Sequence, residues 1–301
     1  MKILYRLFLI IFFMMYAYLA HCDTQVNTPQ VNTAQVNIFK DVVNDSLDNN
    51  FLDTVFYVNS ITSRYNIHPF VVLGIAWNET KFEPYAINMN RFNFILYDTK
   101  EVITFFEILK EGINNARSFI NLTKLYISVY YGGKIIKNIE CVYSMNTNKD
   151  INDVNFRYIR AELNKIKKYN LIRIRSGGHV PIIFKNKYNA IFFTNLLLQY
   201  TSNIDIGLTQ INYNYWIKKY NIEPALVFDP ANAISLSSQI LKSIGEETNW
   251  DLYKMIKYYH SRNKIGDAYA KKVINVINVL TNLYSNYTNK DEKVASINNT
   301  N

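Results

Sequence analysis

Glu79 is the residue of this sequence whose type and placement most directly suggest acid chemistry. It follows an apolar run, "FVVLGIAWN", in which Val71, Ile75 and Glu79 recur at every fourth position. In a helix these three residues share one face, so the carboxyl group extends a line of core residues. A carboxyl group that loses solvating water has a raised pKa, so it can remain protonated and act as a general acid. The alternative is an ordinary surface glutamate at a helix end.

Two further segments carry polar groups suited to ligand binding. The segment "IDIGLTQIN" contains Gly207, which permits a close backbone approach, and Gln210, whose amide can both donate and accept hydrogen bonds. The segment "YYHSRN" contains Tyr259 and His260. Two plainer interpretations remain open, because Gln210 also fits a helix-surface amide and Tyr259 also fits the apolar stripe of its own helix.

The segments around these residues predict a mainly α fold. Pro69 favours the first turn of a helix that carries Glu79 and ends near Phe82, before a proline. A second helix is predicted to start at the Asp-Pro pair 229–230, and Gly245 is suited to end it. Apolar residues at helical spacing then continue through 252–280, which predicts two more helices.

The middle of the chain has a different pattern and predicts an α+β insertion at about 91–180. The run "KLYISVYYGGKIIKNIECVY" predicts a β-hairpin that turns at Gly132 and Gly133. The alternating run "LIRIRS" and the following "VPIIF" predict strands, and residues 155–168 predict a helix. The expected fold is therefore a helical domain interrupted by a partly β segment.

The N-terminal residues indicate export. Lys2 and Arg6 precede an apolar run at 7–20, which is typical of a signal peptide, with an uncleaved anchor as the alternative. After cleavage no stable membrane span is expected, and the predicted location is periplasmic or secreted. The predicted organisation is a signal peptide at 1–22, a low-complexity linker at 23–37, a folded domain at 38–285 and a disordered tail at 286–301.

Composition narrows the class of protein further. Nearly half of the residues are apolar (49%), so a large core is possible and a wholly disordered chain is excluded. The formal charge of +9 suits a polyanion such as nucleic acid, an anionic membrane or an acidic cell wall, or else a solvated lysine-rich surface. Cys22 and Cys141 are the two cysteines, so no disulfide framework is expected. No CxxC or HExxH pattern predicts a metal site.

Three segments resemble the lytic transglycosylases with an SLT domain, a family of the goose-lysozyme-like superfamily. They are similar to the versions that accompany conjugation and type IV secretion systems. The segments are "HPFVVLGIAWNETKFEPYAIN", "NIDIGLTQINYNYW" and "YYHSRNKIGDAYAKKV". Thr80 and Thr209 depart from the serine and methionine that are usual in the family. About 120 residues separate Asn88 from Gly207, a larger distance than in the family, which motivates the insertion.

This resemblance implies a lysozyme-like fold and cleavage of the glycan strands of peptidoglycan. It implies that Glu79 acts first as acid and later as base, while the sugar's own 6-hydroxyl forms a 1,6-anhydro end. It implies substrate-binding or orienting roles for Thr80, Gly207, Gln210, Asn212, Tyr259 and His260. It implies no cofactor and no metal. The implied partners are peptidoglycan strands and secretion or conjugation machinery, with no nucleic acid.

Two alternative functions are left open by the sequence. The first is a muramidase, a hydrolase of the same bond in which Asp205 holds the attacking water. We favour a capping role for Asp205, because aspartate before a glycine turn commonly binds backbone groups. The second alternative is a catalytically inactive wall-binding scaffold, which the long insertion suggests and the presence of Glu79, Gln210 and Tyr259 opposes.

Overall fold

A computed structural model describes residues 58–119, 123–143 and 150–298, so the predicted signal peptide and linker lie outside the described residues. The described residues form an α+β structure, in which 56% of them are helical and 20% lie in the strands of two antiparallel sheets. The predicted excess of helix is therefore confirmed. The chain divides into two compact units, one formed by residues up to Phe82 together with Pro230–Asn301, and one formed by Glu83–Asp229.

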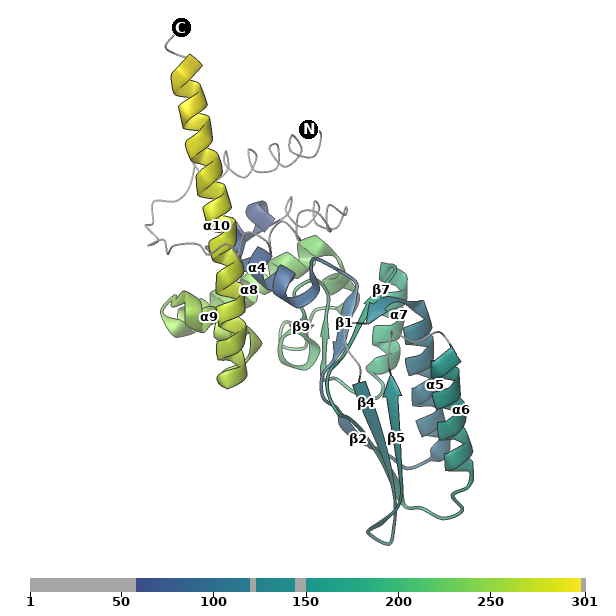
Figure 1. Cartoon of the computed structure of the whole chain (residues 1–301). Helices are drawn as coiled ribbons and strands as arrows, with labels where there is room; N and C mark the ends of the chain where they lie inside the picture. Colours follow the sequence, from purple (N-terminus) through teal and green to yellow (C-terminus); the bar gives the residue numbers. More distant parts are fainter. Residues whose placement is uncertain (1–57, 120–122, 144–149, 299–301) are drawn as a thin grey trace. The chain divides into compact units, whose positions relative to one another are not determined.

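The first unit is helical, and α4 is its most buried helix. Its main helices are α4 (Pro69–Thr80), α8 (Pro230–Thr248), α9 (Leu252–His260) and α10 (Lys264–Asn298) (Figure 1). Pro69 occupies the first turn of α4 as predicted, and the side chain of His68 accepts a hydrogen bond from the backbone N–H of Phe70 at 3.2 Å. Both α8 and α10 pack on α4, where Gly74 allows close contact with Val273 and Ile277 of α10.

The boundaries of the last helices differ from the prediction in two places. Gly245 does not end α8, which continues to Thr248. This glycine instead accommodates the ring of Trp250, because a Cβ at Gly245 would lie 2.8 Å from it. The chain turns at Asn249 and Trp250, both with positive φ. The helix α10 continues to Asn298, through most of the predicted disordered tail at 286–301.

The second unit contains a five-stranded sheet, here called sheet A. Its strand order is β3-β7-β1-β8-β9, and every neighbouring pair is antiparallel. The strands are β3 (Ala116–Phe119), β7 (Val180–Phe184), β1 (Ala86–Met89), β8 (Ile204–Ile206) and β9 (Ile211–Asn212). Strand β1 lies centrally, with Ile87 opposite Ile182 on one side and Ile206 on the other. Apolar side chains on these short strands form the core that supports the turn at Gly207.

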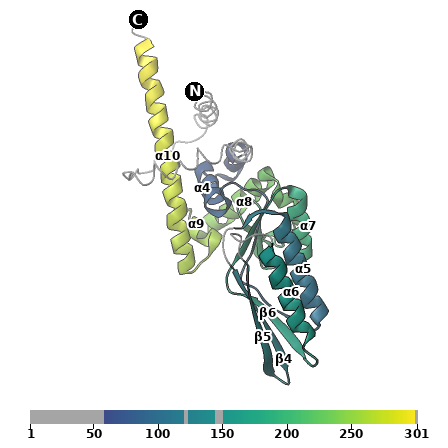
Figure 2. The ribbon, with the colours of Figure 1, turned by 45° about the vertical axis from the view of Figure 1, so that its right-hand side comes forward.

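The second sheet, sheet B, has four strands in the order β2-β6-β4-β5. They are β2 (Asn93–Leu96), β6 (Leu171–Ser176), β4 (Thr123–Tyr131) and β5 (Lys134–Tyr143). The predicted hairpin is confirmed, because β4 and β5 pair around Gly132 and Gly133, both with positive φ. The helices α5 (Thr99–Asn115) and α6 (Asp150–Asn164) lie side by side against one face of this sheet (Figures 1 and 2).

Three shorter helical elements complete the second unit: α7 (Lys187–Leu197), the π-helical turn η2 (Tyr213–Ile217) and the 3-10 helix η3 (Pro224–Phe228). This unit extends beyond the predicted insertion at about 91–180, since it also contains β1, β8 and β9. The insertion itself stays a prediction, and two strands from this region, β3 and the start of β7, belong to sheet A. Among the described residues, no helix combines the length and the apolar character needed to cross a membrane.

Candidate active site

Glu79 lies in the last turn of α4, at the point where this buried helix ends. Residues 71–76 of the helix are buried, while the Glu79 side chain retains 16% of its exposed surface. The helix stops abruptly because Lys81 and Phe82 both adopt left-handed backbone conformations. The predicted site residue Thr80 is buried, and its hydroxyl donates to the backbone carbonyl of Ala76 at 3.2 Å. The helix end therefore leaves the Glu79 carboxyl partly accessible above an apolar core.

His260 and Tyr269 both lie close to Glu79. The Nδ1 atom of His260 is 3.8 Å from Oε1 of Glu79. The His260 ring stacks flat on the ring of Tyr269, with centroids 4.3 Å apart and an interplanar angle of 6°. His260 ends α9, whereas Tyr269 lies in the first part of α10, so three helices bring these groups together. The structure thus places two residues of the predicted site, Glu79 and His260, in direct proximity.

Tyr269 lies within the segment 252–280, in which apolar spacing predicted two helices, and the structure shows it beside Glu79. Its hydroxyl is buried without a well-formed hydrogen bond among the described residues, yet Glu79 and Asn78 are close enough to shift its pKa. Burial raises the pKa of Tyr269 well above its usual value, and the charge of Glu79 raises it further. The hydroxyl therefore stays protonated at neutral pH and can act as a hydrogen-bond donor to the carboxyl. The sequence contained one signal for this role, since Tyr269 places a hydroxyl group among the apolar positions of its helix.

Tyr259 lies in the same unit, and its hydroxyl donates to Oγ of Ser237 at 3.4 Å. It also contributes to the raised pKa of Tyr269, so the two phenols are electrostatic neighbours. The predicted role of Tyr259, orientation of Glu79, stays a prediction. Ser237 on α8 is a contact that the sequence patterns did not indicate.

Cations add to the electrostatics around Glu79. Burial and the nearby charge of Lys272 lower the pKa of Lys81, whereas the charge of Glu79 raises it. The Lys81 ammonium lies 4.1 Å from the ring centroid of Trp77. The surroundings of Glu79 therefore contain an ammonium group in addition to the His260 imidazole.

Gly207, Gln210 and Asn212 belong to the second unit, where the first two lie in the turn between β8 and β9 and Asn212 ends β9. Gly207 has a φ of 79°, and a Cβ there would lie 2.5 Å from the backbone oxygen of Val227. The Gln210 side-chain amide donates to the backbone oxygens of Gly207 at 2.9 Å and Ala86 at 3.3 Å. Gln210 therefore holds the turn against β1, and its predicted contact with a glycan stays a prediction.

Asp205 is held by side-chain amides, so the predicted capping role is wrong. Asn212 donates to Oδ1 of Asp205 at 2.7 Å, and Asn90 donates to Oδ2 at 2.7 Å. The Oδ1 atom of Asn90 in turn lies 2.9 Å from Nδ1 of His179. The pairing of β1 with β8 and of β8 with β9 places these amides on both sides of the carboxyl. Asn212 lies in β9 and Asn90 follows directly after β1, so strand pairing brings these amides to Asp205 and local sequence could not indicate them.

Burial raises the pKa of Asp205 to about 6, although hydrogen bonds from Asn212, Asn90 and Asn88 act in the opposite direction. The folded protein therefore binds this proton more tightly than the unfolded chain does. The contribution of Asp205 to the free energy of unfolding is therefore highest below pH 4, and it decreases by about 3 kcal/mol as the pH rises through 6.

We expect this decrease to be smaller in an Asp205→Asn variant, because the asparagine does not titrate. Urea unfolding at several pH values between 4 and 7 measures it, and the difference between the two proteins isolates Asp205 from other titrating groups. Parallel pH profiles for the two proteins would contradict the assignment.

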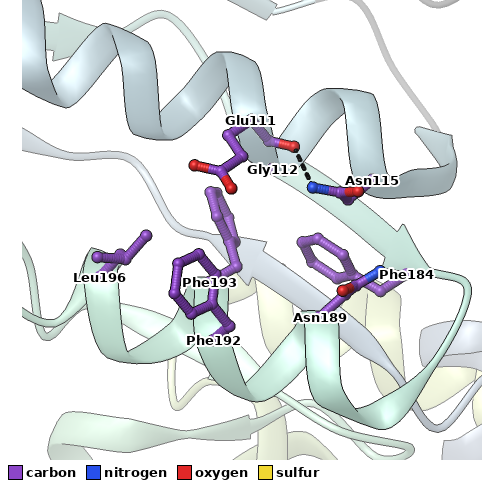
Figure 3. A pocket seen from close by; sticks show the side chains of 8 residues that line it. All are labelled: Glu111, Gly112, Asn115, Phe184, Asn189, Phe192, Phe193 and Leu196. Atoms are coloured by element: carbon purple, nitrogen blue, oxygen red, sulfur yellow. Dashed lines mark hydrogen bonds between the residues drawn. The ribbon is translucent and has the colours of Figure 1, made fainter.

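A small pocket lies between α5 and α7, lined by Glu111, Gly112, Asn115, Phe184, Asn189, Phe192, Phe193 and Leu196 (Figure 3). It has room for about one water molecule and contains none of the predicted site residues. We therefore do not assign it a ligand. Within the ranges that the structure describes, no three His, Cys, Asp or Glu side chains are grouped as a metal site would require.

Comparisons with protein-family models, curated proteins and solved structures found no match to this chain. The resemblance to lytic transglycosylases and the lysozyme-like fold therefore stay predictions that depend on the quoted segments. The group of side chains around Glu79 is the strongest indication of function in the described residues.

Proposed function

We propose that this chain is a peptidoglycan lytic transglycosylase built on a lysozyme-like helical domain. The observation that carries the proposal is the group around Glu79, a largely buried carboxyl with the His260 imidazole at 3.8 Å and the buried Tyr269 hydroxyl nearby. These residues come from two of the three segments that resemble the family, 68–88 and 258–273. A single carboxyl in such a setting suits a reaction that needs one acid and no second carboxylate.

In the proposed reaction, Glu79 protonates the oxygen of the β-1,4 bond between MurNAc and GlcNAc as that bond breaks. The N-acetyl group of the substrate stabilises the positive charge that develops at the sugar carbon. The 6-hydroxyl of the same MurNAc then attacks this carbon and returns its proton to Glu79. The product is 1,6-anhydroMurNAc, and no water is consumed. Tyr269 and His260 would restrict the position of the carboxyl during both proton transfers.

The turn with Gly207, Gln210 and Asn212 is proposed to contact glycan groups, in agreement with the resemblance of its sequence. Export, and action on the wall in the periplasm or outside the cell, are proposed from Lys2, Arg6 and the apolar run after them. The formal charge of +9 suits an acidic wall. Local opening of the wall at a secretion or conjugation channel is the proposed role.

The experiment that tests this function is digestion of purified sacculi, followed by mass spectrometry of the soluble fragments. We expect anhydro ends, which are one water lighter than reducing ends, from the first time point onward. A parallel digest with a hydrolytic muramidase gives the reference for reducing ends.

Two other outcomes identify the alternatives. Reducing ends alone would assign the protein as a muramidase. Both oxygens of Asp205 already accept amide hydrogen bonds, which weakens that reading. Binding to sacculi without any soluble fragment across a broad pH range would assign it as an inactive scaffold.

A further inference from the structure

Sheet B packs one face against α5 and α6, and the described side chains on its opposite face are partly or fully exposed. The side chains that α5 and α6 cover are apolar and buried, among them Ile127, Val129 and Ile174. The alternate positions project to the opposite side, here called the arginine face and defined by Ile95, Tyr126, Tyr130, Ile135, Arg173 and Arg175. Figures 1 and 2 show α5 and α6 on the same side of this sheet.

The two guanidinium groups on this face are held by tyrosine rings. Arg173 and Arg175 alternate on β6, so their side chains leave the sheet on the same side, roughly 7 Å apart along the strand. The Arg175 guanidinium lies 4.8 Å from the ring centroid of Tyr126, and that of Arg173 lies 5.7 Å from Tyr130. Such contacts restrict the side chains, so less freedom is lost when the guanidinium groups bind a ligand.

No carboxylate neutralises either arginine among the residues that the structure describes. Glu140, an acidic residue on the same face, pairs with Lys124 at 2.8 Å. The Nε atom of Arg173 is buried without a hydrogen-bond partner. A buried donor without a partner is unfavourable, and a ligand oxygen that reached it would relieve this cost. The face therefore carries two positive charges that no carboxylate of the described residues pairs.

The neighbouring side chains indicate what kind of anion fits. A ring face that already holds a guanidinium is not available to stack on a nucleic-acid base, which disfavours single-stranded nucleic acid. Ile95 and Ile135 are 40% and 50% exposed on the same face and suit apolar side chains of a ligand. Arginine forks match planar carboxylates. These features together favour an extended peptide that carries carboxylates.

We propose that the arginine face binds the carboxylate-bearing peptides attached to the glycan strands of the wall. The choice of wall peptides as the source depends on the proposed function, whereas the preference for an acidic peptide depends on the face alone. Binding there would retain the protein on peptide-bearing regions of the wall, separately from the cleavage of glycan bonds.

The test measures binding of the full chain to purified sacculi in a Glu79→Gln background, so that the sacculi stay intact. We expect the double variant Arg173→Gln/Arg175→Gln to bind at least about tenfold more weakly. The matched control Lys167→Gln/Lys168→Gln removes two exposed positive charges from the same unit and should bind unchanged. Arg173 is half-buried, so its replacement could also affect folding. The single variant Arg175→Gln changes only an exposed side chain and should also bind more weakly.

Sacculi whose peptides have been removed by an amidase should bind the parent protein and the double variant equally weakly. Equal binding of variant and parent to intact sacculi, no binding of the parent to intact sacculi, or an arginine effect seen only with a single-stranded oligonucleotide would each overturn the proposal. If the protein with Glu79 intact releases no fragments while arginine-dependent binding is retained, only the transglycosylase function is overturned.

Discussion

Replacement of Glu79 by glutamine is expected to lower the release of soluble fragments from purified sacculi by at least about 1,000-fold. The amide keeps the shape of the side chain but cannot donate the proton that the leaving oxygen needs. Glu79 has a side chain that is only 16% exposed, and it lies at the end of a helix whose core residues are unchanged, so the variant should fold. Fragment release against enzyme concentration measures the activity, and thermal unfolding checks the fold.

A matched control for this prediction is Glu246→Gln, which removes one exposed carboxylate from α8 in the same unit. We expect the control to retain the parent activity and both variants to unfold cooperatively near the parent midpoint. Undiminished fragment release by the Glu79→Gln protein would show that another group supplies the proton.

Replacement of Gly207 by alanine is expected to destabilise the second unit by about 4 kcal/mol, the largest stability effect that we predict for a single added methyl group. Two costs combine at this position. The φ of 79° is unfavourable for any residue with a Cβ, and that Cβ would lie 2.5 Å from the backbone oxygen of Val227. The backbone oxygen of Val227 cannot move aside as a flexible side chain can. Gly207 is also fixed in place, because its N–H donates to the backbone oxygen of Ala86 at 2.8 Å.

Two other glycines separate these costs. A Cβ at Gly132 would meet nothing within 4 Å although φ is 57°, so Gly132→Ala should cost about 1 kcal/mol from backbone strain alone. A Cβ at Gly178 meets nothing and the residue has no positive φ, so Gly178→Ala should be nearly neutral. Urea unfolding measures all three variants. Equal losses for Gly207→Ala and Gly132→Ala would contradict the steric argument.

Some of the fold was predictable because its signals are local. Pro69 and the β4–β5 hairpin with its glycine pair were located correctly, since both patterns reflect the geometry of a few consecutive residues. The helix α5 was missed although its buried residues Val102, Phe105 and Leu109 recur at helical spacing. Strands β1, β8 and β9 are two to four residues long, too short to show a periodic pattern, and their existence depends on pairing across the sheet.

The same distinction between local signals and long-range contacts applies to the candidate site. The sequence by itself determined that Glu79 follows an apolar helix stripe and that a glycine occupies the turn at 207, because these are properties of one helix and one turn. Only the tertiary structure decided that Tyr269, 190 positions after Glu79, lies beside it, and that Asp205 is held by Asn90 and Asn212 and does not cap a turn. Helix packing and strand register set those contacts, and they depend on how segments far apart in the chain exclude water together.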